Sequence, residues 1–220
     1  MITLKIHNLP TPDDVILSYI KDNLTYGQNQ IRYRKKVSSE VYNNEINMAM
    51  SGQVSLFDFL ETIREQYQQY FSNLLIVNSW FDYLINVEPE KGPAILPPHT
   101  HTIRTLGINY FIDLGGDEVR TCFYTHKPKS GIAKYESQSK WGGYLSFDDV
   151  EKYGHIVTEK NKWHAYNTRI PHSVEGVTGT RLFFTIVFQP HVEMANLLME
   201  EKLQYQIVPF TRPRTSSLPV

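Results

Sequence analysis

Three histidines in two strand-like segments of this sequence have the spacing of a metal site. His99 and His101 stand two residues apart in Pro98-His99-Thr100-His101, and in an extended strand the side chains at i and i+2 point to the same face. A third imidazole, His172, follows in a later strand-like segment that begins Pro171-His172-Ser173-Val174. Two close ligands and one distant ligand are typical of a three-ligand metal site that keeps coordination positions open. The sequence therefore predicts a metal site at His99, His101 and His172.

A fixed cation follows the third histidine. Arg181 comes just after the Gly179-Thr180 turn and opens the apolar segment 181–188. A planar guanidinium can bind a carboxylate by two parallel hydrogen bonds. An arginine at a strand end most often lies in solvent, but the apolar Leu182 and Phe183 beside it place Arg181 at the edge of a core. We therefore expect Arg181 to face an anionic group near the metal.

Together these motifs resemble those of the 2-oxoglutarate/Fe(II)-dependent oxygenases, over roughly residues 80–190. Pro98-His99-x-His101 stands where that family has His-x-Asp, and Pro171-His172-Ser173-Val174 stands at the family's distal histidine. Gly179-x-Arg181 stands at the arginine that holds the C5 carboxylate of 2-oxoglutarate. The resemblance is closest to the small phage and bacterial members, and it departs from the pattern at His101, where the family has an aspartate.

The resemblance implies a fold, two cofactors and an activity. The fold would be a double-stranded β-helix (jelly-roll or cupin-like). Fe(II) would bind to His99, His101 and His172, and 2-oxoglutarate would bind to Arg181, with Asn109 donating to its C1 end. A satisfied polar group in a strand is an equally good interpretation of Asn109. The enzyme would couple oxidative decarboxylation of 2-oxoglutarate, a small-molecule cosubstrate, to hydroxylation of a C–H bond in a primary substrate that the sequence does not identify.

The histidine at position 101 leaves other functions open. Replacing a carboxylate by a neutral imidazole removes one negative charge, which weakens the hold on a divalent ion and alters its redox potential. Imidazole is nevertheless a competent ligand for iron. Two alternatives follow: a three-His, cupin-like metal dioxygenase that needs no 2-oxoglutarate, or a non-catalytic jelly-roll interaction or virion-associated protein that kept the fold without the chemistry.

The order of predicted elements indicates an α+β chain with its strands in the centre. We expect one oxygenase-like domain over 1–220, with a helical part at about 1–73, a β-helix core at about 74–190, and a C-terminal helix and tail at about 191–220. Helical spacing of apolar residues predicts helices over 11–23, 55–72 and 192–205. Alternation and β-branched residues predict strands over 1–7, 74–87, 106–114, 118–125, 155–158, 163–168 and 181–188.

The connections between these elements carry predictions of their own. Gly115-Gly116 is expected to make a tight turn that pairs 106–114 with 118–125 as a hairpin. Residues 88–98 are expected to form a loop and 147–153 one or two helical turns. The Ser/Lys-rich segment 128–143 is expected to be a long insertion beside the site.

Length and composition limit the classes of function. A chain of 220 residues is most simply one domain, and 22 Lys and Arg against 23 Asp and Glu give no basic footprint for nucleic acid. A single cysteine, Cys122, excludes an internal disulfide framework and favours a reducing compartment. No apolar run has transmembrane length and no signal peptide is evident, so a soluble, cytoplasmic protein without a membrane partner is expected.

Other chemically capable side chains are interpreted as structural. Cys122 lies in mid-strand and is expected to be an inert core residue. The pair Glu200-Glu201 is expected to be solvated on a helix. The histidines outside the predicted site are interpreted as ordinary; they are His7, His126, His155, His164 and His191.

Overall fold

The structure is a computed structural model that describes residues 3–12, 35–36, 66–85, 94–101, 105–127, 135–139, 142–189 and 192–212. The predicted helix over 11–23 lies almost wholly outside these residues. Of the predicted helix over 55–72, residues 66–68 are described and are helical.

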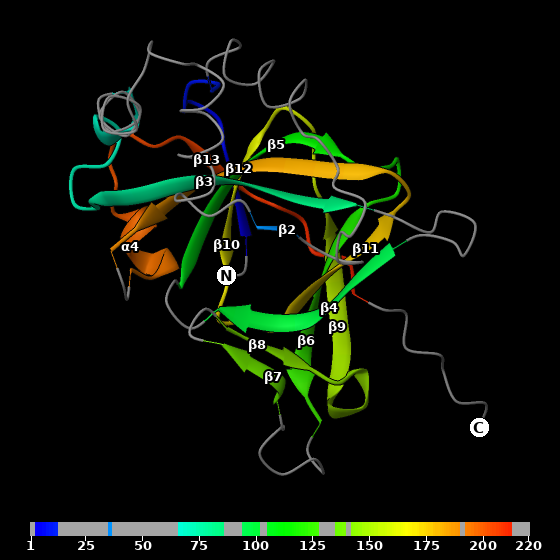
Figure 1. Ribbon diagram of the computed structural model, residues 1–220. Helices are drawn as coiled ribbons and strands as arrows, with labels where there is room; N and C mark the ends of the chain where they lie inside the picture. Colours follow the sequence, from blue (N-terminus) through cyan, green and yellow to red (C-terminus); the bar gives the residue numbers. More distant parts are fainter. Residues whose placement is uncertain are drawn as a thin grey trace, which may run out of the picture.

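Thirteen described strands form two antiparallel sheets (Figure 1). Sheet A has the order β13-β1-β10-β5-β12-β3-β2, and sheet B has the order β7-β8-β4-β11-β6-β9. The strands of sheet A are β1 (Thr3–Ile6), β2 (Lys35–Lys36), β3 (Ile76–Ile85), β5 (Leu106–Leu114), β10 (Trp163–Asn167), β12 (Thr180–Phe188) and β13 (Tyr205–Ile207). Those of sheet B are β4 (Ala94–His101), β6 (Arg120–His126), β7 (Tyr135–Ser139), β8 (Gly142–Leu145), β9 (Val150–Val157) and β11 (His172–Val177).

The chain passes repeatedly from one sheet to the other. Strands β3, β5, β10 and β12 belong to sheet A, and the strands that alternate with them along the chain, β4, β6, β9 and β11, belong to sheet B. The result is a β-rich, jelly-roll-like sandwich, as the sequence predicted for its central part. The helices of the described residues are the turn at 66–68, the 3-10 helix η2 (Phe147–Asp149) and α4 (Met194–Leu198). None of these helices has the length or apolar character needed to span a membrane.

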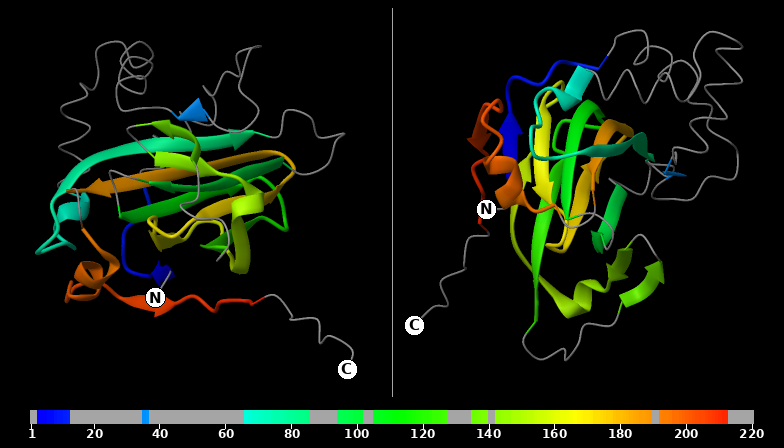
Figure 2. Two further views of the ribbon diagram at one scale, coloured as in Figure 1. Left: turned by 90° about the horizontal axis from the view of Figure 1, so that it is seen from below. Right: turned by 90° about the vertical axis from the view of Figure 1, so that its left-hand side faces the viewer.

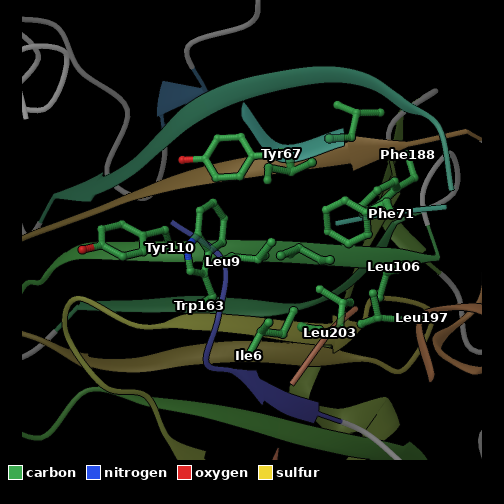
Figure 3. Close-up of a cluster of buried hydrophobic side chains, with 14 of the residues drawn as sticks. Ile6, Leu9, Tyr67, Phe71, Leu106, Tyr110, Trp163, Phe188, Leu197 and Leu203 are labelled. Carbon is green, nitrogen blue, oxygen red and sulfur yellow. The ribbon is translucent and has the colours of Figure 1, made fainter. Parts of the chain in front are cut away.

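The face of sheet A turned away from sheet B carries the largest apolar cluster (Figure 3). Every second residue of β5 from Leu106 to Ile112 points into it, together with Leu182 and Phe184 of β12. The helical segment before β3 covers this face, where the ring of Tyr67 meets that of Trp163 edge-on at 5.4 Å between centroids. Burying one such side chain contributes about 1.5–3 kcal/mol, so this cluster holds sheet A in place.

The opposite face of sheet A packs against sheet B and forms the interior of the sandwich. Phe111 of β5 and Tyr166 of β10 share one buried cluster with Phe123 of β6 and Ile156 of β9. Because successive side chains in a strand alternate in direction, Asn109 and Phe111 of β5 point into this interior. The predicted site residues lie along the same interior.

The predicted hairpin between 106–114 and 118–125 is wrong. Strand β5 pairs with β10 and β12, whereas β6 pairs with β9 and β11 in the other sheet. Gly115 and Gly116 do turn the chain, with φ of 77° and 152°, but they carry it across the sandwich. The carbonyl of Gly115 accepts the N–H groups of Thr178 and Gly179, both at 2.8 Å, so this crossing is fixed to the turn that precedes β12.

Three further element predictions need correction. The expected loop 88–98 gives way at Ala94 to β4, and the prolines at 97 and 98 lie inside the strand, where its ladder with β11 is irregular. A proline lacks the N–H that a regular ladder needs. The expected turns over 147–153 shrink to η2 because β9 begins at Val150 and pairs with β6. The insertion 128–143 contains β7 and the start of β8.

The C-terminal helix predicted over 192–205 is limited to α4, and the chain then forms β13. Strand β13 adds to the free edge of β1, with Leu4 opposite Ile207. Figure 2 shows these two strands side by side, so the two ends of the described chain meet at one edge of sheet A. An edge strand offers unpaired backbone groups, and pairing with it outweighs the helical spacing of the local sequence.

Candidate metal centre

Two neighbouring strands of sheet B bring the three predicted histidines together. Strand β4 carries His99 and His101, and β11 places His172 directly opposite His99 in the ladder. One ligand atom from each ring lies within 4.8 Å of those of the other two. The ring centroids of His99 and His172 are 4.4 Å apart, and His101 lies 5.2 and 5.3 Å from them. This triad can hold a metal ion, as the spacing in the sequence predicted.

The tautomers of two of these rings are fixed by backbone carbonyls. The Nδ1 atom of His99 lies 2.9 Å from the Pro97 carbonyl, and Nδ1 of His172 lies 2.8 Å from the Ile170 carbonyl. A carbonyl oxygen can only accept, so each Nδ1 carries the hydrogen and donates it. The lone pair of a neutral ring is then on Nε2, which is the atom available for a metal. This is the usual outer support of a metal-binding histidine.

The triad stands at the end of the interior rather than at its centre. His99 is 6% exposed, whereas His101 and His172 are half-buried. Beneath it, Phe123 packs on the ring of His172 with 6.5 Å between centroids. One side of the triad therefore rests on the aromatic interior and the other remains accessible.

A polar cluster on the outer face of sheet B holds β11 in register. Tyr124 Oη lies 2.9 Å from Ser173 Oγ and donates to the Glu175 carboxylate at 2.8 Å, and Lys152 donates to the same carboxylate at 2.7 Å. Burial, followed by the charge of Glu175, raises the pKa of Cys122 beside this cluster to about 11. Cys122 is thus a buried thiol, as expected, and the cluster fixes the strand that carries His172.

Arg181 points into the interior from β12 and is 3% exposed. Its guanidinium carbon lies 4.7 Å from the ring centroid of Phe111 and 5.8 Å from that of Phe183. The interpretation of Arg181 as a solvated strand-end charge is therefore excluded. The backbone of this residue is also confined, since a Cβ at Gly115 would lie 2.7 Å from the Arg181 nitrogen.

Two hydroxyl groups near Arg181 are further candidates for the site. Thr121 Oγ1 and Tyr166 Oη are buried and lie close to each other, and neither makes a hydrogen bond of good geometry among the described residues. Burial raises the pKa of Tyr166, and the nearby charge of Arg181 opposes that rise. A buried hydroxyl without a partner costs about 1–3 kcal/mol, so both groups are suited to a ligand that accepts hydrogen bonds. Strand parity places Thr121 with Phe123 on the inner face, which was the available sequence signal.

Asn109 also lies on the inner face of sheet A, in the middle of β5. Its Oδ1 accepts a hydrogen bond from the Thr185 hydroxyl of β12. That contact directs the amide nitrogen, the donor end of the side chain, away from Thr185. The role of Asn109 at one end of a bound carboxylic acid stays a prediction.

His164 was interpreted from the sequence as an ordinary histidine, but its surroundings in the structure are unusual. It is 0% exposed, it lies beside Asn109 in the β5–β10 ladder, and its ring stacks on Tyr166 at an interplanar angle of 17°. Burial lowers its pKa to about 4. Its Nε2 accepts the backbone N–H of Glu159 at 3.3 Å, so the neutral ring carries its hydrogen on Nδ1, which has no partner among the described residues.

Glu200, expected to be solvated, is 1% exposed. Its carboxylate accepts the backbone N–H groups of Ser72 at 2.5 Å and Asn73 at 2.9 Å. It therefore ties the segment that follows α4 to the segment that leads into β3.

The sequence matches no family model and no curated protein. Among solved structures, a Pseudomonas putida prolyl-4-hydroxylase is similar to this chain with a TM-score of 0.26 and 12% sequence identity. The match covers 84% of this chain and 100% of that chain. At such a TM-score the likeness does not define the fold, which is defined by the strand order and the ladders described above.

Proposed function

We propose that this protein is an Fe(II)- and 2-oxoglutarate-dependent oxygenase, a hydroxylase, built on a double-stranded β-helix. The observation that carries the proposal is the placement of three converging histidines and a buried arginine along one sandwich interior. Arg181 lies against Phe111, which shares a buried cluster with Phe123, and Phe123 packs on His172. A metal site and a buried cation in one interior suit a ligand that binds both.

The pairing of the strands supports the proposed fold. Numbered along the chain, the eight core strands are β3, β4, β5, β6, β9, β10, β11 and β12. The first pairs with the last (β3 with β12), the second with the seventh (β4 with β11), the third with the sixth (β5 with β10), and the fourth with the fifth (β6 with β9). Such pairs make one long antiparallel ribbon, and its alternation between two sheets winds that ribbon into a helix of paired strands.

The donor set of the triad fits a divalent iron ion. Neutral imidazole nitrogens suit Fe, Zn, Cu and Ni. In His99 and His172 Nδ1 donates to a backbone carbonyl, so the lone pair of the neutral ring is on Nε2. His99, His101 and His172 would hold the ion, and a site with only three protein ligands would leave room for a cosubstrate. His101 occupies the position of the expected carboxylate, so the ion keeps its full positive charge and favours anionic ligands.

The interior beneath the triad fits a dicarboxylate. The Arg181 guanidinium can take one carboxylate by paired hydrogen bonds, and the hydroxyls of Thr121 and Tyr166 would donate to the same group. Asn109 would donate to the end nearer the metal. Phe111 and Phe183 flank the guanidinium and exclude water, which strengthens its attraction for an anion.

In this proposal O2 would be the oxidant, and the metal would couple the oxidation of 2-oxoglutarate to succinate and CO2 with hydroxylation of a C–H bond. The chain contributes positioning, because His99, His172 and Arg181 stand on strands whose ladders fix their separation. The half-buried side of His101 and His172 is where a primary substrate would approach.

One observation favours a second candidate, a three-His metal dioxygenase without 2-oxoglutarate. The carboxylate ligand of the proposed family is replaced by His101, and an all-imidazole site can activate oxygen for a substrate that binds the metal directly. This candidate predicts oxygen consumption that depends on iron and yields no succinate.

Anaerobic titration of the purified protein with Fe(II) and then 2-oxoglutarate tests the proposal. The expected result is a visible metal-to-ligand charge-transfer band that is lost in His172→Ala and needs more 2-oxoglutarate in Arg181→Gln. His101→Asp should strengthen iron binding and the band. Iron binding without the band would favour the three-His dioxygenase, and no metal binding under these conditions would favour the non-catalytic scaffold.

A further inference from the structure

The two histidines that face each other across the β4–β11 ladder share a local arrangement. Each donates its Nδ1 hydrogen to the carbonyl of the residue two positions earlier, at 2.9 Å for His99 and 2.8 Å for His172. In both cases the residue in between is a proline, Pro98 or Pro171. The two segments lie in different strands, far apart in the sequence, so the arrangement occurs twice independently.

Proline explains why these carbonyls are available. In a regular strand the carbonyl groups lie in the plane of the sheet and enter the ladder. The pyrrolidine ring fixes φ near −65°, removes the N–H donor, and restricts the preceding residue to extended conformations. The carbonyl of residue i−2 is then held in one direction relative to the histidine at i. Both Pro98 and Pro171 are buried, so their surroundings prevent relaxation.

We propose that Pro98 and Pro171 are positioning residues that set the tautomer and ring direction of His99 and His172. Each proline holds the carbonyl that takes the Nδ1 hydrogen, and so leaves Nε2 as the metal-binding atom. His101 follows Thr100 and has no such proline. In the metal-free protein, local chain geometry therefore orients two of the three ligands, His99 and His172. The third ligand, His101, is oriented in another way. The consequence for metal affinity rests on the proposed function, but the consequence for the tautomers does not.

The decisive experiment measures ring tautomers in the metal-free protein. Histidine ring ¹⁵N chemical shifts, recorded at about pH 8 with a chelator, distinguish a hydrogen on Nδ1 from one on Nε2. His99→Gln and His172→Gln assign the two signals. In the unsubstituted protein both rings should carry the hydrogen on Nδ1. Pro98→Ala should give His99 a mixture of tautomers and leave His172 unchanged, and Pro171→Ala should do the reverse.

Pro209→Ala is the control, because it removes an exposed proline that belongs to neither histidine segment and keeps the prolines directly before His99 and His172. It should leave both tautomers as they are, and the His101 signal should not respond to any of the three substitutions. A fully Nδ1-protonated His99 in a folded Pro98→Ala protein would overturn the proposal, as would an Nε2-protonated ring in the unsubstituted protein. If Pro98→Ala does not fold, Pro171→Ala provides the same comparison at the other ligand.

Metal affinity gives a second, separate measurement. Titration with Co²⁺ alone, followed by visible absorption, should show about tenfold weaker binding in each of Pro98→Ala and Pro171→Ala, the usual effect of losing an outer hydrogen-bond partner of a ligand. Pro209→Ala should bind as the unsubstituted protein does. Absence of Co²⁺ binding in every form would contradict the metal function, while the tautomer result would still decide the role of the prolines.

Discussion

The buried ring of His164 makes the stability of this protein dependent on pH in a specific window. The folded chain keeps His164 neutral, with a pKa of about 4 against an ordinary value of 6.5. Burial is the main cause, the positive charges of Lys5 and Arg181 add to it, and Glu159 opposes it. As pH falls through 6.5, the unfolded chain takes up a proton that the folded chain does not bind. Stability is therefore lost from about pH 6.5 downward, and the loss ends near pH 4.

The magnitude follows from the two pKa values. A difference of about 2.5 pKa units corresponds to about 3 kcal/mol over the whole window, and about 2 kcal/mol of it falls between pH 7.5 and pH 5. Since a domain of this kind is typically stable by about 5–15 kcal/mol, the loss should be plainly measurable. Urea unfolding at the two pH values, with a chelator present throughout, gives the free energies.

The replacement His164→Gln removes the ionisable group and isolates its contribution. The decrease in the free energy of unfolding from pH 7.5 to pH 5 is the quantity to compare. It should be about 2 kcal/mol smaller in this variant than in the unsubstituted protein. All other histidines are present in both proteins, so their contributions cancel in the difference. Ile156→Val, in the interior cluster next to His164, should cost about 1 kcal/mol and keep the full pH dependence. Equal pH dependence in the His164→Gln and unsubstituted proteins would refute the reasoning.

Three more substitutions have defined outcomes. Gly115→Ala should destabilise the fold by about 2–4 kcal/mol in urea unfolding, because its φ is positive and its Cβ would meet the Arg181 backbone; an unchanged midpoint would contradict this. Glu200→Gln should cost about 2 kcal/mol in the same assay by weakening a carboxylate that accepts two backbone N–H groups. Tyr166→Phe should leave stability unchanged or higher but weaken 2-oxoglutarate binding about tenfold, measured by calorimetry, whereas Tyr153→Phe should change neither.

Much of the site was predictable because its signals are local. The i, i+2 spacing of His99 and His101 needs only an extended strand, and β4 provides it. The position of Arg181 beside apolar residues indicated a buried cation, and its exposure of 3% agrees. Strand alternation likewise separates the residues of β5 into two faces, although it does not say which face is the interior.

The remaining features depend on which distant strands pair, and no local pattern states that. The sequence between β5 and β6 has the composition of a hairpin turn, yet each strand finds its partners elsewhere. The burial of His164 requires β10 to lie in the middle of sheet A, and the burial of Glu200 requires the segment after α4 to lie against residues 72–73. Helical spacing near the C-terminus was outweighed by an open sheet edge at β1.

The geometry of the triad therefore has two origins that act at different distances. Ring direction at His99 and His172 is set within three residues of each ligand, by a proline and the carbonyl before it. Convergence of the rings depends instead on the β4–β11 register, which the cluster of Tyr124, Ser173 and Glu175 supports from the outer face. A metal ion that needs all three rings can bind only when β4 and β11 are paired in this register. Metal binding would therefore stabilise this register by mass action. Metal affinity and the stability of the β4–β11 pairing are then thermodynamically linked. Substitutions on the outer face of β11 would therefore change the metal affinity of a site that they do not contact.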